Sequence, residues 1–385
     1  MKCSSFWDVG SMEIKREISI KIKKFLSKKM VLISGPRQVG KTFLTRSFLT
    51  NNYVYLNYDD EDDRKIIQDK SWPRDVDLII FDELHKKDKW KTWLKSIFDK
   101  EGINPNIVVT GSARMEVFKK GGDSLAGRHF HVRLHPLSIK EYGKGAKKEI
   151  IQKMMMLGSF PEPLLSDDMK DSKLWRKSHL ERIIKEDLLD LERVNELKKI
   201  EVLVQLLSER VGSAINYASL GRDLEVSSHT IKHWLQILEN LYVIFKVTPL
   251  SKNIAKSILK APKYYFYDTG RVRANDGAKL ENIVACHLLK RNNYLEDIEG
   301  EKLDLFYIRD KEKREVDFAI ERNFMLEKLI EVKMSDDNLS KPLKYFTDKL
   351  TPRESTQIVF NIKQNKQYYE IKVRDLTTYL YNLEA

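Results

Sequence analysis

Short apolar runs alternate with amphipathic segments over the first 140 residues. Four runs have the length and pattern of strands, either uniformly apolar or alternating between apolar and polar residues: 31–34, 53–57, 78–81 and 107–110. Uniformly apolar strands are typical of a parallel sheet that is buried on both faces. Helix-spaced apolar residues precede the first run and lie between later ones, notably at 89–98. This alternation predicts an α/β domain with a parallel sheet over residues 1–140.

The pattern turns helical after residue 140. Residues 151–157 and most of 174–207 have helical spacing, which predicts a helical subdomain over 141–212. Two further helices, split by a short turn and followed by a strand-like run, predict a winged-helix-like segment over 213–255. Strand-like runs then return at 264–267, 305–308, 315–320 and 329–332. They predict a C-terminal α/β domain over 256–385.

The stretch GPRQVGKT, between the first strand and a helix, fits the phosphate-binding pattern G-x-x-x-x-G-K-[ST] in full. Glycine lets backbone N–H groups curl around phosphate oxygens, and the helix N-terminus adds a positive end. We expect Lys41 to neutralise β- and γ-phosphate charge and the Thr42 hydroxyl to hold Mg²⁺. The stretch therefore predicts a site for ATP and Mg²⁺. Its predicted nucleotide-binding residues are Gly35, Pro36, Arg37, Gln38, Val39, Gly40, Lys41 and Thr42.

Asp82 and Glu83 directly follow the apolar run at 78–81. We expect Asp82, at the carboxyl end of a strand, to be a second magnesium ligand. Glu83 beside it would polarise a water molecule toward the γ-phosphate. Acidic residues often end strands, so Asp82 and Glu83 alone are weak evidence for a nucleotide site. The upstream Lys41 and Thr42 make the assignment strong.

Three further residues are candidates for contacting the γ-phosphate or its transition state. Ser112 follows the run at 107–110, where a small hydroxyl could bind the γ-phosphate or the attacking water; a plain turn is the alternative. Arg114 and Arg128 are candidate arginine fingers. For each of them a surface or salt-bridged arginine is the alternative.

Four motifs in this order, GPRQVGKT, IIFDELHK, VVTGSAR and LAGRHFHVRLHPLSIKEY, resemble a prokaryotic family of AAA-type ATPases with a C-terminal domain of unknown function. Two later segments, NYASLGRDLEVSSHTIKHWLQILENLYVIF and APKYYFYDTGRVR, resemble the same family, so the resemblance covers nearly the whole chain. In that family a glycine-linked arginine follows the ATPase sheet, which favours Arg128 over Arg114 as the finger. AAA-type relatives commonly form rings, and the resemblance therefore implies a homo-oligomer.

The helix pair within 213–255 has a face that could enter a DNA groove. The start of its second helix would expose Ser228, His229 and Lys232 to the bases. That face is only modestly positive. The alternative is a packing module that joins the ATPase to the rest of the chain.

A second candidate site combines Asp317, Glu331 and Lys333. Residues two apart in a strand face the same side, and Asp317 lies in the preceding strand. Two carboxylates can hold Mg²⁺ against a phosphodiester, and a lysine can orient or activate water. The arrangement resembles the restriction-endonuclease-like fold, in which an upstream helix glutamate often completes the metal site, and Glu281 matches that place. An active nuclease, a nucleic-acid-binding remnant and a structural domain are the three alternatives.

Composition narrows the partners and the compartment. The chain of 385 residues has 69 Lys and Arg against 57 Asp and Glu, a formal charge of +12 and a pI near 9.3. An acidic polymer is therefore the expected partner, with DNA favoured, and a solubilising surface is the alternative. Two cysteines cannot build a disulfide framework, and they suit a reducing cytoplasm. No stretch approaches the ~20 apolar residues of a membrane span.

These patterns together predict a cytoplasmic ATPase that couples Mg-ATP hydrolysis to the binding, remodelling or translocation of DNA or RNA. Metal-dependent cleavage at the C-terminal site is a further hypothesis. The alternative function is a nucleotide-gated switch in a defence or signalling system, whose C-terminal domain binds a protein partner.

Overall fold

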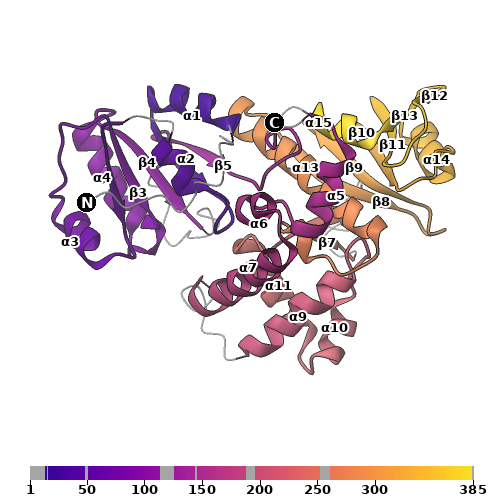
Figure 1. Ribbon diagram of the computed structural model, residues 1–385, viewed down its shortest axis with the longest axis horizontal. Coiled ribbons are helices and arrows are strands. Elements are labelled where there is room, and N and C mark those ends of the chain that lie inside the picture. The colour runs from indigo at the N-terminus through magenta and orange to yellow at the C-terminus, as the bar shows by residue number, and fades with distance from the viewer. Residues whose placement is uncertain are drawn as a thin grey trace.

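The computed structural model describes residues 14, 16–47, 51–112, 125–143, 145–187, 196–251 and 261–383. A parallel sheet with its helices forms one end of the molecule, a mixed sheet forms the other, and helices lie between and below them (Figure 1). The candidate finger Arg114 lies outside the described residues.

The N-terminal sheet has five parallel strands in the order β2-β3-β4-β1-β5. They are β1 Met30–Ser34, β2 Tyr53–Asn57, β3 Leu78–Asp82, β4 Asn106–Gly111 and β5 His129–Arg133. Alternate residues of β1 enter two different apolar cores, Val31 and Ile33 on one face and Met30 and Leu32 on the other. Burial on both faces explains why the strand is apolar throughout. The predicted parallel sheet is confirmed.

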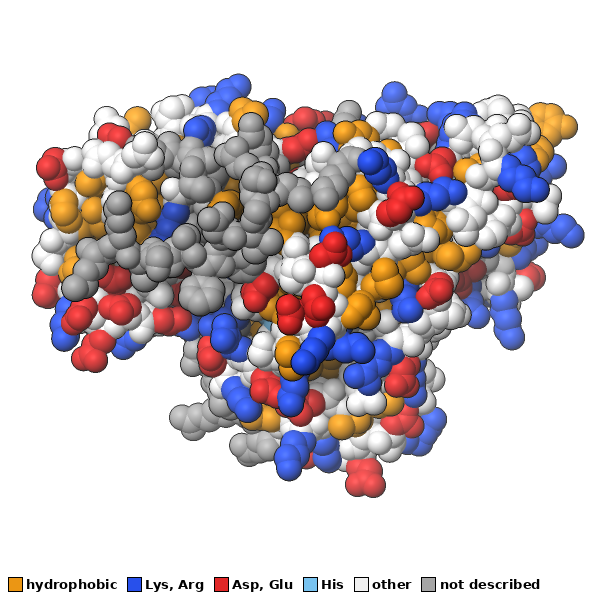
Figure 2. Space-filling model, viewed as in Figure 1, with side chains coloured by type: hydrophobic (Ala, Val, Ile, Leu, Met, Phe, Trp, Pro, Cys, Tyr) orange, Lys and Arg blue, Asp and Glu red, His pale blue; other side chains and the backbone are white. Residues whose placement is uncertain are grey.

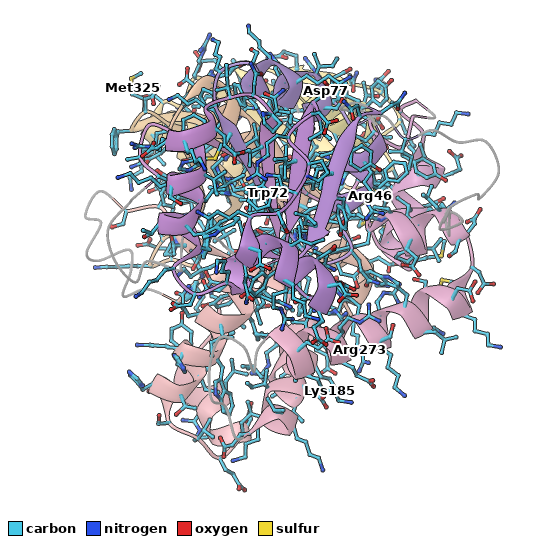
Figure 3. All side chains as sticks on the ribbon, turned by 90° about the vertical axis from the view of Figure 1, so that its left-hand side faces the viewer. Arg46, Trp72, Asp77, Lys185, Arg273 and Met325 are labelled. Carbon is cyan, nitrogen blue, oxygen red and sulfur yellow. The ribbon has the colours of Figure 1, made fainter. Side chains whose placement is uncertain are left out.

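Helices cover both faces of this sheet. They are α1 Ile18–Leu26, α2 Lys41–Ser47, α3 Glu61–Asp69 and α4 Trp90–Glu101, with a short 3-10 turn at Leu84–Lys86. On one face Trp72 and Trp93 pack edge-on against Phe81 of β3, with ring centroids 5.3 and 5.4 Å away. Figure 3 looks onto this end of the molecule and labels Trp72 within it.

The middle part is helical, as its periodicity predicts. Its helices are α5 Lys148–Leu157, α6 Pro161–Ser166, α7 Met169–Arg182, α9 Leu197–Glu209, α10 Tyr217–Asp223 and α11 Ser228–Asn240, and a π-helical turn, Ile183–Asp187, extends α7. Pro161 occupies the first turn of α6, where its missing N–H costs nothing. The Ser227 hydroxyl caps α11 by accepting a hydrogen bond from the N–H of Thr230 at 3.0 Å.

The C-terminal sheet is mixed and has eight strands in the order β12-β13-β11-β10-β9-β8-β6-β7. The strands are β6 Ile244–Pro249, β7 Lys263–Phe266, β8 Leu303–Arg309, β9 Glu315–Arg322, β10 Met325–Lys333, β11 Glu354–Val359, β12 Lys366–Tyr368 and β13 Ile371–Asp375. Strands β8, β9 and β10 are antiparallel neighbours, and β11 and β13 then run parallel to β10. Because β6 pairs with both β7 and β8, the strand that follows the helix pair α10–α11 belongs to this sheet.

One long helix connects the parts of the molecule. Helix α13, Asp276–Glu299, has 24 residues and packs on β5, α5, β7, β8 and β10. At a rise of about 1.5 Å per residue it spans roughly 36 Å. The remaining elements are a 3-10 turn at Thr269–Arg271 and the helices α14 Lys341–Leu350 and α15 Leu376–Tyr381.

Candidate functional site

Residues 35–42, which we call the phosphate loop, connect β1 to α2 at the carboxyl edge of the parallel sheet. A Cβ atom on Gly35 would lie 2.3 Å from the carbonyl oxygen of Leu134, and φ is +153° at Gly35 and +98° at Gly40. Both positions therefore require glycine. The buried ammonium group of Lys41 donates hydrogen bonds to two loop carbonyl oxygens, at 2.8 and 2.9 Å.

Three hydroxyl groups converge on the carboxylate of Asp82, which ends β3. Thr42 donates to one carboxylate oxygen at 2.9 Å, and Tyr55 of β2 donates to the same oxygen at 2.5 Å. Thr110 of β4 donates to the other oxygen. Burial and then the charge of Asp82 raise the pKa of Tyr55, so the phenol keeps its proton. The predicted magnesium ligands Thr42 and Asp82 are thus in direct contact, and the sequence reasoning missed Tyr55 and Thr110.

Glu83 follows with a left-handed backbone, φ +53°, which is uncommon for a residue other than glycine. Ser112 donates a hydrogen bond to its carboxylate at 3.2 Å, and the Nδ1 atom of His85 lies 3.5 Å from the same oxygen. Burial, with the charges of Lys86 and Lys41, lowers the pKa of His85 to about 3, so its imidazole is neutral near pH 7. The structure therefore brings Ser112 to Glu83, and its contact with the γ-phosphate stays a prediction.

Arg128 lies at the opposite edge of the sheet from the phosphate loop. It directly precedes β5, and the first residues of β1 and β5, Met30 and His129, pair in parallel register. The loop follows the far end of β1. The guanidinium group of Arg128 pairs instead with Asp99 of α4 at 2.6 Å. The fold does not bring Arg128 to the phosphate loop of its own chain.

Helix α7 packs against the phosphate loop. The Nε2 atom of His179 donates a hydrogen bond to the carbonyl oxygen of Arg37 at 3.1 Å, and its ring stacks on Trp175 with centroids 4.5 Å apart. Burial lowers the pKa of His179 to about 3. The guanidinium group of Arg37 pairs with Glu186, beyond the end of α7, at 2.7 Å. A second part of the chain, α7 and the turn that follows it, thus contacts the loop.

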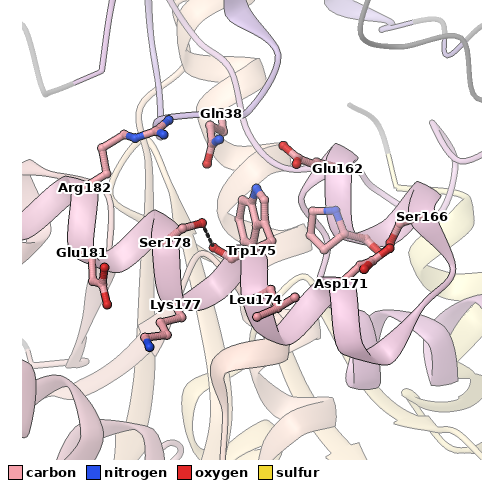
Figure 4. A pocket seen from close by; sticks show the side chains of 11 residues that line it. Gln38, Glu162, Ser166, Asp171, Leu174, Trp175, Lys177, Ser178, Glu181 and Arg182 are labelled. Carbon is pink, nitrogen blue, oxygen red and sulfur yellow. Dashed lines mark hydrogen bonds between the residues drawn. The ribbon is translucent and has the colours of Figure 1, made fainter.

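A cavity of about 610 Å³ opens between the phosphate loop and helices α6 and α7. Figure 4 shows Gln38 of the loop and Arg182 of α7 close together at one end of it, with Glu162 of α6 on the other side of the Trp175 indole. The cavity is lined by both signs of charge. Its lining residues come from the phosphate loop and from the two helices, so the cavity borders both parts of the chain.

Asp317 and Glu331 lie on adjacent strands, β9 and β10. The N–H of Val332 donates to the Asp317 carboxylate at 2.8 Å, and Lys333 pairs with Glu331 at 2.7 Å. Burial and then the charge of Glu331 raise the pKa of Asp317 well above its usual value. The second carboxylate oxygen of Glu331 is buried and has no hydrogen-bond partner among the described residues. Three of the four residues that the sequence singled out here are therefore together.

Glu281, the fourth, has other partners. It accepts hydrogen bonds from Lys263 at 3.1 Å and from Tyr265 at 2.6 Å, and the fully buried Lys263 also pairs with Glu315 at 2.7 Å. Within the described ranges, no group of three or more His, Cys, Asp and Glu side chains is placed to hold a metal ion. Among the described residues Glu281, Asp317 and Glu331 therefore do not form the expected three-carboxylate metal site. Glu281 is paired with Lys263, although its charge still helps to raise the pKa of Asp317.

The start of α11 has the exposure that a groove-binding helix needs. Ser228, His229 and Lys232 are all exposed, and the Lys232 ammonium group lies 5.3 Å from the centroid of the Tyr217 ring. These contacts fit the start of a recognition helix and also the surface of a packing module.

Comparison with known proteins gives a class for part of the chain. Residues 27–143 match the profile of a family described as AAA domain. Residues 148–281 and 276–379 match two families, each described as a domain of unknown function (DUF8612 and DUF4143). The first match agrees with the parallel sheet and its phosphate loop: the N-terminal part resembles the AAA-type P-loop ATPases.

The chain is also similar to proteins and structures over most of its length. An uncharacterised protein of Methanocaldococcus jannaschii is 27% identical over 342 residues, 80% of this chain and 75% of that protein. One of Haemophilus influenzae is 26% identical over 302 residues, 68% of this chain and 74% of that one. A Walker-type ATPase of Pyrococcus abyssi aligns with a TM-score of 0.41 and 16% identity, over 71% of this chain and 96% of that one. The RuvB Holliday junction branch migration motor of Thermotoga maritima aligns with a TM-score of 0.34 and 17% identity, over 64% and 95%.

No helix in the described part of the chain is long and apolar enough to cross a membrane.

Proposed function

We propose that the protein binds Mg-ATP in the phosphate loop and hydrolyses it. The observation that carries this proposal is the contact between Thr42 and Asp82 beside the buried ammonium group of Lys41. A hydroxyl, a carboxylate and an ammonium group are the side chains that P-loop ATPases use for a magnesium triphosphate. When bound, Mg²⁺ would supply positive charge against the phosphate groups. Thr42 and Asp82 would hold it, and Lys41 would exchange its loop carbonyl partners for phosphate oxygens.

We assign Glu83 to orient the attacking water. Ser112 donates a hydrogen bond to the Glu83 carboxylate at the carboxyl edge of β3 and β4, and the Nδ1 atom of His85 lies 3.5 Å from the same oxygen. Because His85 is neutral, no imidazolium cancels the negative charge of Glu83 there. The carboxylate can therefore polarise a water molecule that lies between it and the γ-phosphate.

ATP turnover of Glu83→Gln tests this assignment. We expect the variant to bind Mg-ATP as the wild type does and to turn it over at least ~100-fold more slowly, since general-base catalysis contributes that much or more. Glu61→Gln, which changes an exposed residue of α3, is the matched control and keeps the wild-type rate. A Glu83→Gln protein with the turnover of the control would remove Glu83 from this role.

We further propose that hydrolysis is coupled to DNA or RNA held by the rest of the chain. The formal charge of +12 and the exposed start of α11 support this partner. On the face in Figure 2, Lys and Arg side chains are interspersed with Asp and Glu, and the proposed partner would bind through the lysines and arginines. The affinity for single-stranded and duplex oligonucleotides should then fall steeply as salt rises. An affinity that does not change with salt contradicts a nucleic-acid partner.

Cleavage of that nucleic acid is the hypothesis for the C-terminal site. One buried oxygen of Glu331, which has no hydrogen-bond partner in the described part of the chain, favours it, because such an oxygen beside Asp317 is suited to accept a divalent cation. We expect Mg²⁺-dependent nicking of DNA in the wild type and none in Glu331→Gln. Glu299→Gln, at the exposed end of α13, is the control. Intact DNA with every protein would leave this region a binding domain.

We also propose a homo-oligomer in which Arg128 acts on a neighbouring subunit. The support is its place at the edge of the sheet away from its own phosphate loop. Arg128→Ala and Lys41→Ala should each be inactive alone. A mixture should recover turnover, because some subunit boundaries then join an intact loop to an intact Arg128. If the mixture of the two variants stays inactive, Arg128 does not act as an arginine finger on the phosphate loop of a neighbouring subunit.

A nucleotide-gated switch is the second candidate function. The packing of α7 on the loop favours this function, because His179 and Glu186 both contact Arg37 of the loop. A change in the loop on nucleotide binding would therefore alter contacts of α7 directly. Slow turnover that no nucleic acid stimulates would support the switch, and strong stimulation by one nucleic-acid form would support the motor.

A further inference from the structure

The segment 133–141, which follows β5, lies along α13 of the C-terminal part. We call it the linking segment. The side chain of His135 donates a hydrogen bond to Asn293 at 2.9 Å, and the N–H of Ile139 donates to the Nε2 atom of His287 at 3.1 Å. Both histidines are buried, and burial lowers their pKa values to about 3 and about 4, so they are neutral. Polar groups of the ATPase domain and of α13 are thus paired directly across this contact.

Glu141 is the charged centre of the contact. The same carboxylate oxygen of Glu141 accepts two hydrogen bonds, one from Arg16 at 2.9 Å and one from Lys290 of α13. Burial opposes the ionised form, but the charges of Arg16 and Lys290 outweigh it and lower the pKa of Glu141 to about 2. Lys290 also donates to the carbonyl oxygen of Pro136 at 3.2 Å. A buried carboxylate therefore holds one cation from the N-terminal part and one from the long helix.

Arg16 extends this network to the phosphate loop. Its second nitrogen donates to the carbonyl oxygens of Val39 and His135, both at 2.8 Å. Val39 lies directly before Gly40 and Lys41 in the loop. A guanidinium group bonded to this carbonyl fixes one peptide plane of the loop, and the neighbouring N–H groups are those that phosphate would bind.

We propose that Arg16, Glu141 and Lys290 are positioning residues for the phosphate loop, and that Lys290 makes ATP binding depend on the seating of α13. This inference rests on the proposed ATPase function. The same helix bears Glu281, nine residues before Lys290, or about 14 Å along its axis. The network therefore connects the phosphate loop to the helix that borders the C-terminal carboxylates.

Substitution of Lys290 tests the link. We expect Lys290→Met to raise the Kd for Mg-ATP about tenfold, the effect of losing a charged hydrogen bond. Turnover at saturating ATP should stay within about twofold, because the water-orienting residues are untouched. Lys279→Met is the matched control, since Lys279 lies on the same helix and its ion pair within the described ranges is with the exposed Asp276. Lys290→Arg should restore the wild-type Kd.

The calorimetric stoichiometry separates positioning from loss of folding. A variant that folds poorly would lower the number of sites per chain, whereas a displaced loop raises the Kd at an unchanged number of sites. Arg16→Lys is the second variant. It keeps a positive charge beside Glu141, but one ammonium group cannot reproduce the planar fork that bonds Val39 and His135, so its Kd should also rise about tenfold.

The outcomes are distinct. Equal Kd values for Lys290→Met, Arg16→Lys and Lys279→Met would overturn the inference and leave the ATPase function intact. A wild-type protein that binds no Mg-ATP would overturn the ATPase function itself.

Discussion

The phosphate loop and the C-terminal carboxylates are built in different ways. In the loop, one run of residues supplies the backbone turn, the ammonium group and the hydroxyl, and Asp82 reaches them from the adjoining strand. The C-terminal cluster draws its side chains from α13, β7, β9 and β10. Two of its carboxylates already have lysine partners, Glu281 with Lys263 and Glu331 with Lys333. The first site depends on local backbone geometry and the second on the balance of buried charges.

A methyl group at the first position of the loop should have the largest effect. Gly35→Ala places a Cβ 2.3 Å from a backbone oxygen, so the loop must shift. A displacement of about 1 Å in a positioned site can cost ~100-fold, and we expect at least that loss in ATP affinity. Gly300→Ala is the control, because its φ is also positive, +72°, but nothing lies within 4 Å of the added atom. It should cost only about 1 kcal/mol of stability and leave ATP affinity unchanged. Calorimetry measures the affinities, and comparable affinities in both variants contradict the role of the Gly35 backbone.

Removal of the buried lysine should test the charge balance of the other region. Lys263→Met removes the buried cation that pairs with Glu281 and Glu315. Glu281 then lacks a charge partner, while Glu315 keeps Arg309 at 3.5 Å, so the free energy of unfolding should fall by about 3–5 kcal/mol. Lys302→Met removes an exposed pair with Asp304 and should cost less than about 1 kcal/mol. Denaturant unfolding compares the two, and similar losses would show that Lys263 does not hold the cluster together.

Divalent cation should act on the carboxylate cluster without nucleotide. If Asp317 and Glu331 hold Mn²⁺, ten times the Kd of the ion raises the free energy of unfolding by about 1.4 kcal/mol. The measurement uses Asp82→Asn protein, so that the phosphate loop does not contribute. Adding Glu331→Gln should abolish the gain. A gain that persists would place the ion elsewhere.

Acid should weaken the region of the phosphate loop. The pKa of His179 is lowered to about 3 in the fold by burial and is near 6.5 when unfolded, so the unfolded chain binds the proton first. Stability that is present above pH 6.5 is lost as the pH falls toward 3. Between pH 7 and 5.5 this histidine should account for about 1 kcal/mol of the loss. Thermal unfolding at the two pH values measures the loss of unfolding free energy, which should be smaller by about 1 kcal/mol in His179→Gln than in the wild type. An equal loss in the two proteins contradicts a buried neutral imidazole at His179.

The elements of the phosphate loop were readable because their signals are local. Apolar runs gave β1, β3 and β4, and the motif GPRQVGKT marked the turn that only glycine can make at Gly35. The partners of Asp82 were not readable. Tyr55 and Thr110 reach it because β2 and β4 flank β3, and strand order is a result of packing that no single segment encodes.

In the C-terminal region, too, local features could be predicted from the sequence and contacts between distant elements could not. Alternation and spacing predicted that Asp317, Glu331 and Lys333 would meet, since a strand period of two fixes which side chains share a face. The role of Lys263 was not predicted, because the residue directly precedes the strand-like run 264–267 and carries no signal of its own. Its pairing with Glu281 exists only when β7 lies against α13. Strands β11 and β13 were not predicted either, although they pair in parallel beside β10.

Calorimetric titration of Mg-ATP into the folded wild-type protein and into Lys41→Ala is the decisive test of nucleotide binding at the phosphate loop. We expect one nucleotide bound per wild-type chain and at least a ~100-fold weaker interaction in Lys41→Ala, since the lysine would neutralise the charge of the β- and γ-phosphates. Equal affinity in the two proteins, or no binding to a folded wild type, would contradict it.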